Sequence, residues 1–272
     1  MSLKDDLDLA LELADIADTI TMARYRAEDL EIVTKPDMTP VSESDKRAEL
    51  AIRQRLAHVR PQDAVIGEEF GGAQALLDGG GTQATAGTRA WVIDPIDGTK
   101  SYVRGMDTWS TLIALMVGGV VQVGVVSMPA LRKRWWATRG GGAFAGGEPI
   151  TVSSVSELAD AQLVWSGVQE WDEAGARADG ALDLNALLRL ARACWRTRGI
   201  GDAWQYMLVA EGAAEIAIDP EVTLWDLAAV SIVVEEAGGR FTNTSGEPGP
   251  GGGSGLASNG LLHDAALARL LG

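Results

Sequence analysis

The stretch Trp91–Lys100, with the sequence WVIDPIDGTK, is the most informative part of this chain and points to its chemistry. Its first three residues are apolar and predict the end of a buried strand, which then meets two carboxylates, Asp94 and Asp97. Pro95 fixes its own φ and keeps Asp94 extended. Gly98 permits a tight turn and a close approach of a ligand to the backbone. We therefore expect paired carboxylates beside a tight turn.

The residues after Gly98 favour the binding of an anion next to these acids. The backbone N–H groups of Thr99 and Lys100 are of the kind that bind phosphate oxygens. Carboxylates for a hard cation, followed by amides for an anion, are typical of a site for Mg²⁺ and phosphate. The same residue types also form plain surface turns, so this alternative stays open for the motif alone. An EF-hand calcium loop is excluded, because its twelfth position is Gly105 and not a glutamate.

Two further acids border apolar elements elsewhere in the chain. Glu68 follows the predicted strand Ala64–Ile66, and Asp226 lies in the first turn of a helix predicted over 225–237. Each alone could be a solvated loop residue or a charge favoured by the helix dipole. Half-burying several unpaired carboxylates is costly, and shared cations would remove that cost. The pattern therefore indicates an oxygen-ligand metal site.

Composition limits the remaining possibilities. The 272 residues, 46% of them hydrophobic, can bury a large core. Cys194 is the only cysteine, which favours a reducing cytoplasm, and the charged N-terminal region and the lack of an 18-residue apolar run argue against a signal peptide or membrane span. A net charge of −15 argues against nucleic acid or an anionic membrane as partner.

Histidine usage narrows the choice of metal. The chain has two histidines, His58 and His263, so a three-histidine zinc site cannot be built. Both are expected at the surface or at an edge. Oxygen ligands favour Mg²⁺ or Mn²⁺.

Periodicity predicts mixed helices and strands without internal repeats. Expected helices are 3–27, one from a Ser42 or Ser44 cap to Val59, 181–195, 202–212, 225–237 and a last one holding His263. Expected strands are 64–66, 90–93, 161–166 and 214–218, together with the hairpin of 111–117 and 120–128 and one further hairpin around 140–142 and 146–147. The segments 71–87 and 248–255 are expected to be an excursion and a solvent loop.

The motifs, taken in order, resemble one known family. They are GEE at 67–69, DPIDGT at 94–99, GGAF at 141–144, WDLAA at 225–229, EAGG at 236–239 and ASN at 257–259. From about Lys35 to the C-terminus the chain resembles the inositol-monophosphatase-like Mg²⁺-dependent phosphatases. The resemblance implies an α+β fold, a layered α-β-α-β-α sandwich. It also implies one catalytic domain over 1–272, with halves of about 1–151 and 152–272, and a homodimer.

The resemblance also implies a role for each acid. Glu68, Asp94 and the Ile96 carbonyl would bind one metal, and Asp94, Asp97 and Asp226 a second, with a third, weaker ion near Glu68. The cofactor would be two to three Mg²⁺ ions, which Mn²⁺ can replace. The catalytic residues would be Thr99, which positions the attacking water, Asp45, which aligns the Thr99 hydroxyl, and Glu68. The Gly98 and Thr99 amides would hold the phosphate.

The expected substrate follows from positions where this sequence differs from the motifs common in inositol phosphatases. The stretch Lys100–Leu115 looks most like the histidinol-phosphate phosphatase branch, although Asp107 stands where that branch usually has proline. Asp202 and Asp219 match positions that contact the non-phosphate part of the substrate, and two carboxylates there suit a cationic aminol. For Asp202 a helix N-cap is an equal alternative.

The expected function is hydrolysis of L-histidinol phosphate to L-histidinol and phosphate, in histidine biosynthesis. The alternatives are another phosphomonoesterase, acting on inositol monophosphate, fructose bisphosphate or 3′-phosphoadenosine nucleotides, and a non-catalytic binder of metal or phosphate. The pair Thr99 and Asp45 argues against the binder, which would not need to activate water.

Overall fold

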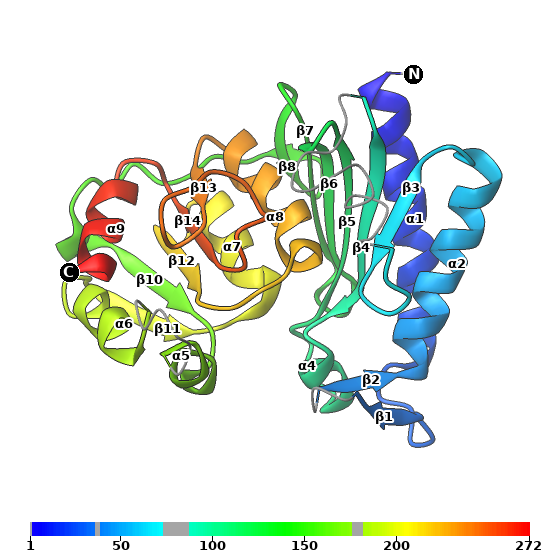
Figure 1. Cartoon of the computed structure of the whole chain (residues 1–272), viewed down its shortest axis with the longest axis horizontal. Helices are drawn as coiled ribbons and strands as arrows, with labels where there is room; N and C mark the ends of the chain where they lie inside the picture. Colours follow the sequence, from blue (N-terminus) through cyan, green and yellow to red (C-terminus); the bar gives the residue numbers. More distant parts are fainter. Residues whose placement is uncertain (1, 36–38, 73–86, 176–181) are drawn as a thin grey trace.

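The two larger β-sheets alternate with three layers of helices in a computed structural model of the chain (Figure 1). The structure describes residues 2–35, 39–72, 87–175 and 182–272. From one side to the other the layers are helices, a seven-stranded sheet, helices, a five-stranded sheet and helices (Figure 1). The α-β-α-β-α arrangement expected from the resemblance is confirmed.

The larger sheet belongs to the N-terminal part of the chain. Its strands lie in the order β3 to β9, with β3 parallel to β4 and every other neighbour antiparallel. They are β3 (Ala64–Gly67), β4 (Arg89–Asp97), β5 (Ser110–Val117), β6 (Val120–Met128), β7 (Lys133–Thr138), β8 (Gly142–Ala145) and β9 (Glu148–Pro149). The register between β4 and β5 shifts between Asp94 and Asp97, so the strand is irregular where the two acids lie.

Two long helices cover the outer face of this sheet (Figure 1): α1 (Leu3–Arg24) and α2 (Glu43–Val59). Their apolar stripes pack on Trp91, Ile93 and other inward residues of the sheet. Ser42, one of the two caps expected from the sequence, caps α2, and it shares a reciprocal capping box with Asp45. This cap also fixes Asp45 at the end of the helix nearest the acids of β4.

The smaller sheet has the strand order β11-β10-β12-β14-β13. Its strands are β10 (Gln162–Trp165), β11 (Arg196–Gly199), β12 (Ile216–Asp219), β13 (Arg240–Thr242) and β14 (Gly255–Ser258). Strands β11, β10 and β12 run parallel, and β14 runs antiparallel to both of its neighbours. The C-terminal ends of the parallel strands β10 and β12 therefore lie side by side, and they face the acids of β4.

The middle layer consists of α7 (Asp202–Ala210) and α8 (Leu224–Glu236), which lie between the two sheets (Figure 1). Most of α8 is buried from Leu227 to Val234, so it is apolar all round rather than amphipathic. The outer layer consists of α5 (Val168–Gly175), α6 (Leu184–Ala191) and α9 (His263–Leu271). A short hairpin, β1 (Ile32–Thr34) with β2 (Pro40–Ser42), and the one-turn helix α4 (Thr99–Val103) complete the region around the site.

Several expected boundaries need correction. The first helix ends at Arg24 and not at residue 27, because Arg26 has a positive φ of 62°. The segment 248–255 is not wholly a solvent loop, since Ser254 is buried and Gly255 begins β14. The helix expected over 181–195 spans Leu184–Ala191. Most of the excursion expected over 71–87 lies outside the described residues.

The expectation for His263 is wrong, whereas His58 is exposed as expected. His263 is fully buried, and its two ring nitrogens each lie 2.9 Å from a hydroxyl, those of Thr242 and Ser258. Burial lowers the pKa of His263 to about 4. The ring is therefore neutral at physiological pH and ties the start of α9 to strands β13 and β14.

No helix in the described part of the chain is long and apolar enough to cross a membrane.

Candidate active site

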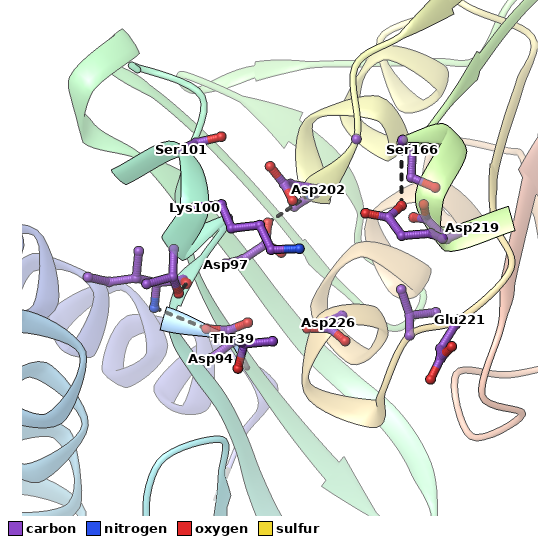
Figure 2. A pocket seen from close by; sticks show the side chains of 18 of the residues that line it. Thr39, Asp94, Asp97, Lys100, Ser101, Ser166, Asp202, Asp219, Glu221 and Asp226 are labelled. Atoms are coloured by element: carbon purple, nitrogen blue, oxygen red, sulfur yellow. Dashed lines mark hydrogen bonds between the residues drawn. The ribbon is translucent and has the colours of Figure 1, made fainter. Parts of the chain in front are cut away.

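A cavity of about 450 Å³ opens between the two sheets and contains most of the predicted site residues. Its walls come from the end of β4, from α4, from the ends of β10 and β12, and from the first turns of α7 and α8. Figure 2 shows Asp94 and Asp97 at one side of this pocket, Ser166 and Asp219 at the other, and Asp226 between them. Residues from both halves of the chain therefore meet around one space.

Three of the predicted ligands form a tight group. Asp94 and Asp97 come from β4 and Asp226 from the first turn of α8, and one carboxylate oxygen of each lies within 4.8 Å of the others. Asp94 and Asp97 are buried. Asp94 and Asp97 precede Asp226 by 129 or more positions in the sequence. The packing of α8 against the larger sheet brings the three together.

The hydrogen bonds of this group come from neutral donors. Asp94 accepts the Ile96 amide at 3.0 Å, while Asp97 accepts the Ser110 hydroxyl at 2.9 Å. Asp226 accepts the backbone N–H of Thr223 at 2.6 Å and its hydroxyl at 2.8 Å. These bonds orient the carboxylates without neutralising them.

Electrostatics show the cost of this arrangement. Burial, followed by repulsion from Glu68, Asp97 and Asp226, raises the pKa of Asp94 well above its usual value. Burial and repulsion from Asp202 and Asp226 do the same to the pKa of Asp97. Hard oxygen donors packed this closely fit a divalent cation, which would turn the repulsion into attraction. The residues present therefore fit a metal site.

Glu68 lies beside this group but is held by a lysine. One of its carboxylate oxygens lies 2.9 Å from Lys35 Nζ, and the same ammonium lies 2.6 Å from Glu69. Burial raises the pKa of Glu68, and Lys35 opposes the rise. The charge of Glu68 still acts on Asp94. The sequence did not predict this ion pair, and residues 36–38 beside Lys35 lie outside the described part.

A buried acid of α2, Glu49, supports the Glu68 turn and was missed from the sequence. It accepts the backbone N–H of Glu69 at 2.7 Å and of Phe70 at 3.3 Å, and it pairs with Arg53 at 2.7 Å. A side chain at Gly67 would have its Cβ only 2.0 Å from Glu49 Oε1. A signal was available: Glu49 falls on the helical stripe of Asp45, Ile52 and Leu56, which is buried.

The predicted pair Thr99 and Asp45 lies within hydrogen-bonding distance. Thr99 Oγ1 lies 3.2 Å from Asp45 Oδ1 and 2.9 Å from the Ile96 carbonyl oxygen. Asp45 is held on its other oxygen by the backbone N–H and hydroxyl of Ser42, at 2.9 and 2.5 Å. Burial raises the pKa of Asp45 to about 6. The Thr99 hydroxyl is thus shared between two acceptors at the pocket wall.

Gly98 occupies a position where a side chain would not fit. Its φ is 81°, which favours glycine, and a Cβ there would lie 2.7 Å from Asp202 Oδ2 and 3.2 Å from the Thr108 carbonyl oxygen. Gly98 is the N-cap of α4, whose first residue is Thr99. The backbone between Asp97 and Thr99 can therefore turn tightly beside the acids.

Asp202 begins α7 but does not cap it, so the N-cap alternative is wrong. The N-cap is Gly201, so no side chain caps the helix. The backbone N–H of Ala203, in the first turn, donates a hydrogen bond to Asp97 at 2.7 Å. Asp202 has a φ of 52°, unusual for a residue with a side chain. Burial, then the charges of Glu170 and Asp226, raises its pKa to about 7. Its carboxylate faces the Gly98 turn.

Asp219, at the end of β12, lines the pocket but is already engaged by the protein. Its Oδ2 accepts the Gln205 amide and, at 2.7 Å, the Tyr206 hydroxyl, both from α7. Burial raises the pKa of Asp219 to about 7. The sequence placed Asp219 at the substrate end of the site, and the structure adds that it joins β12 to α7.

Asp107, the departure from the branch pattern, has a structural explanation. It accepts the Tyr25 hydroxyl at 2.8 Å and pairs with Arg26 at 3.1 Å. Tyr25 also packs on Tyr102 and Trp109, with ring centroids 5.5 Å apart in each pair. Asp107 therefore ties the end of α1 to the loop after α4.

A family model described as the inositol monophosphatase family matches residues 3–271. The chain is 51% identical to a histidinol-phosphatase of Mycobacterium tuberculosis, over 98% of each chain. It is 53% identical to a histidinol-phosphatase of Streptomyces coelicolor, over 98% of this chain and 97% of the relative. A solved inositol monophosphatase of Thermotoga maritima superposes with a TM-score of 0.82 at 27% identity, covering 98% of this chain and 96% of that one.

Proposed function

The chain belongs to the inositol monophosphatase family, and from this premise we propose that it hydrolyses L-histidinol phosphate to L-histidinol and phosphate, in histidine biosynthesis. The observation that carries the chemistry is the meeting of the Asp94, Asp97 and Asp226 carboxylates with the Thr99–Asp45 pair in one cavity. The substrate is taken from the two histidinol-phosphatases that are more than half identical to this chain.

The carboxylates would hold the metal. We assign Asp94, Asp97 and Asp226 as its ligands, joined by Glu68 and the Ile96 carbonyl oxygen, and we propose two to three Mg²⁺ ions that Mn²⁺ can replace. Bound there, the cations would supply the positive charge that a phosphoryl group needs in its transition state. The Ile96 carbonyl already accepts the Thr99 hydroxyl, and its second lone pair leaves it able to bind a cation.

The chain's own groups would position the water and the phosphate. Thr99 Oγ1, held by Asp45, can accept or pass a proton at the pocket wall, where a water molecule would attack phosphorus. The bond between phosphorus and the ester oxygen breaks, and the leaving alkoxide takes up a proton to become the alcohol. The amides of Gly98 and Thr99 would hold the phosphate oxygens. Lys100, the only basic side chain among the described residues lining the pocket, reaches between its two sides (Figure 2).

The charge of the pocket favours a substrate with a cationic end. Beyond the metal ligands the lining includes Asp202, Asp219, Glu170 and Glu221. A second phosphate, as in fructose bisphosphate or 3′-phosphoadenosine nucleotides, would meet these carboxylates. An aminol that carries an ammonium group would be attracted to them. The acids therefore support histidinol phosphate over the polyanionic alternatives.

We also propose that residues 1–272 act as one catalytic domain and that two copies assemble as a dimer. The pocket is lined from both halves of the chain, so neither half contains the site alone. Trp195 is 66% exposed, which offers apolar surface to a partner, whereas Trp135 belongs to the core. A single 28.6 kDa species in light scattering would contradict the dimer.

The metal requirement is tested with the purified protein and L-histidinol phosphate. We expect phosphate and L-histidinol to be released in equal amounts with Mg²⁺ or Mn²⁺ present, and release to stop in excess chelator. Adding either cation back should restore it. Undiminished turnover in the chelator would contradict the metal assignment.

A further inference from the structure

One end of the pocket contains polar groups that no step of the hydrolysis uses. Ser166 follows β10, and Glu170 lies in the first turn of α5; both line the cavity, and we call them the distal subsite. Figure 2 shows Ser166 on the same side as Asp219, across the pocket from Asp94 and Asp97. A small substrate whose phosphate lies at the aspartates would point its other end toward this side.

The Ser166 hydroxyl is buried and unpartnered. Ser166 is 6% exposed, and its Oγ has no hydrogen-bond partner among the described residues. It lies near enough to Asp219 to lower that residue's pKa, but the two oxygens do not reach normal hydrogen-bond geometry. A buried hydroxyl without a partner is costly. At a cavity wall, a ligand that supplies a donor or acceptor would remove that cost.

Glu170 lines the pocket and is held in place by the backbone of the preceding turn. Its Oε2 accepts the Gly167 N–H at 3.1 Å, which fixes the side chain in the first turn of α5. Burial is the main cause of the raised pKa of Asp202, and the charge of Glu170 is the next largest. The charge of Glu170 also raises the pKa of Asp219. Glu170, Asp202 and Asp219 line the same pocket, so a cation placed among them would be attracted by all three.

The other acids on this side are less suited to the role. Asp219 already accepts from Gln205 and Tyr206. The carboxylate of Asp202 lies against Gly98, at the phosphate end of the pocket. Glu221 points away from Ser166 and Asp219 (Figure 2). The charged group best placed to meet the far end of a substrate is Glu170.

We propose that Glu170, together with the Ser166 hydroxyl of the same pocket, binds the ammonium group of an aminol phosphate and sets the preference of the enzyme for such substrates. This inference rests on the proposed function, because it assigns part of the same pocket to the cationic end of the substrate. It differs from the expectation based on sequence, which gave that role to Asp202 and Asp219.

Glu170→Gln is the decisive variant, because a glutamine oxygen can still accept the Gly167 N–H while the charge is lost. We expect KM for L-histidinol phosphate to rise about tenfold or more, with a much smaller change in kcat. Hydrolysis of inositol 1-phosphate should be unchanged or improved. Calorimetry should show L-histidinol, which has no phosphate, binding more weakly to the variant. Ser166→Ala should raise KM about fivefold, as expected for one hydrogen bond.

Glu221→Gln is the matched control, since it removes one negative charge from another part of the same pocket. An equal rise in KM for Glu221→Gln would show an effect of total charge and would overturn the assignment. So would an unchanged KM in Glu170→Gln, provided the wild type hydrolyses L-histidinol phosphate. If the wild type does not hydrolyse that compound, the proposed function itself fails. Thermal unfolding of each variant confirms that the fold is intact.

Discussion

Replacing Asp94 by asparagine should abolish phosphate release from L-histidinol phosphate while leaving the protein folded. Asp94 lies at the centre of the carboxylate group, where Glu68, Asp97 and Asp226 all raise its pKa in addition to burial. Losing its charge removes one of the three carboxylates that lie together and would hold a divalent cation. We expect a loss of at least the roughly 10²–10³-fold that follows removal of one strong electrostatic contact to a transition state. Phosphate release and calorimetric binding of Mn²⁺ measure the two effects separately.

The stability of the same variant gives an independent check. A carboxyl whose pKa is raised on folding destabilises the folded protein above the pKa it has when unfolded. In metal-free buffer at neutral pH, Asp94→Asn should therefore unfold at the same temperature or higher. Asp264→Asn, at a side chain that is 85% exposed, serves as the control for removing one charge. An Asp94→Asn protein with normal turnover would contradict the metal site, and one that is less stable would contradict the repulsion inferred here.

Thr99→Ala should lower kcat by about 10²-fold or more, because the variant loses the hydroxyl that Asp45 and the Ile96 carbonyl hold at the pocket wall. KM should change much less, since the carboxylates and the Gly98 turn remain. Steady-state kinetics separate the two parameters. Thr99→Ser retains the hydroxyl and should recover most of the rate. A normal kcat with a strongly raised KM would show that Thr99 binds substrate and does not position the nucleophile.

Local sequence patterns predicted much of the fold and the core of the site. The apolar run before Asp94 and the one after Asp226 indicated a strand and a helix, and the structure has β4 and α8 there. Ser42 was one of two expected caps, and its capping box positions Asp45. Each of these signals depends on residues within a few positions of one another, which a sequence displays directly.

The rest depends on contacts between distant parts of the chain. Lys35 holds Glu68 across 33 positions, and Glu49 holds the Glu69 amide across 20. His263 looked like a surface residue, because its partners Thr242 and Ser258 belong to strands that the patterns did not show. Such partners become visible only when the sheets and helices are assembled.

The substrate end of the pocket shows the same limit. Asp202 was a plausible N-cap because it stands at the start of a predicted helix. Its φ is positive, however, and its carboxylate lies against Gly98. Ser166 and Glu170 belong to no motif, and they reach the pocket only because β10 and β12 end at the same sheet edge. Residue type and spacing therefore indicate the type of reaction more directly than they indicate the substrate.

The choice of substrate is measured by the ratio of kcat/KM for L-histidinol phosphate to that for inositol 1-phosphate, with one enzyme preparation in Mg²⁺. We expect a ratio well above one, because the acids beyond the metal site attract the ammonium of histidinol phosphate and have no such charge attraction for a neutral polyol. A ratio below one would contradict the assignment to histidinol phosphate and leave only a metal-dependent phosphatase of this family.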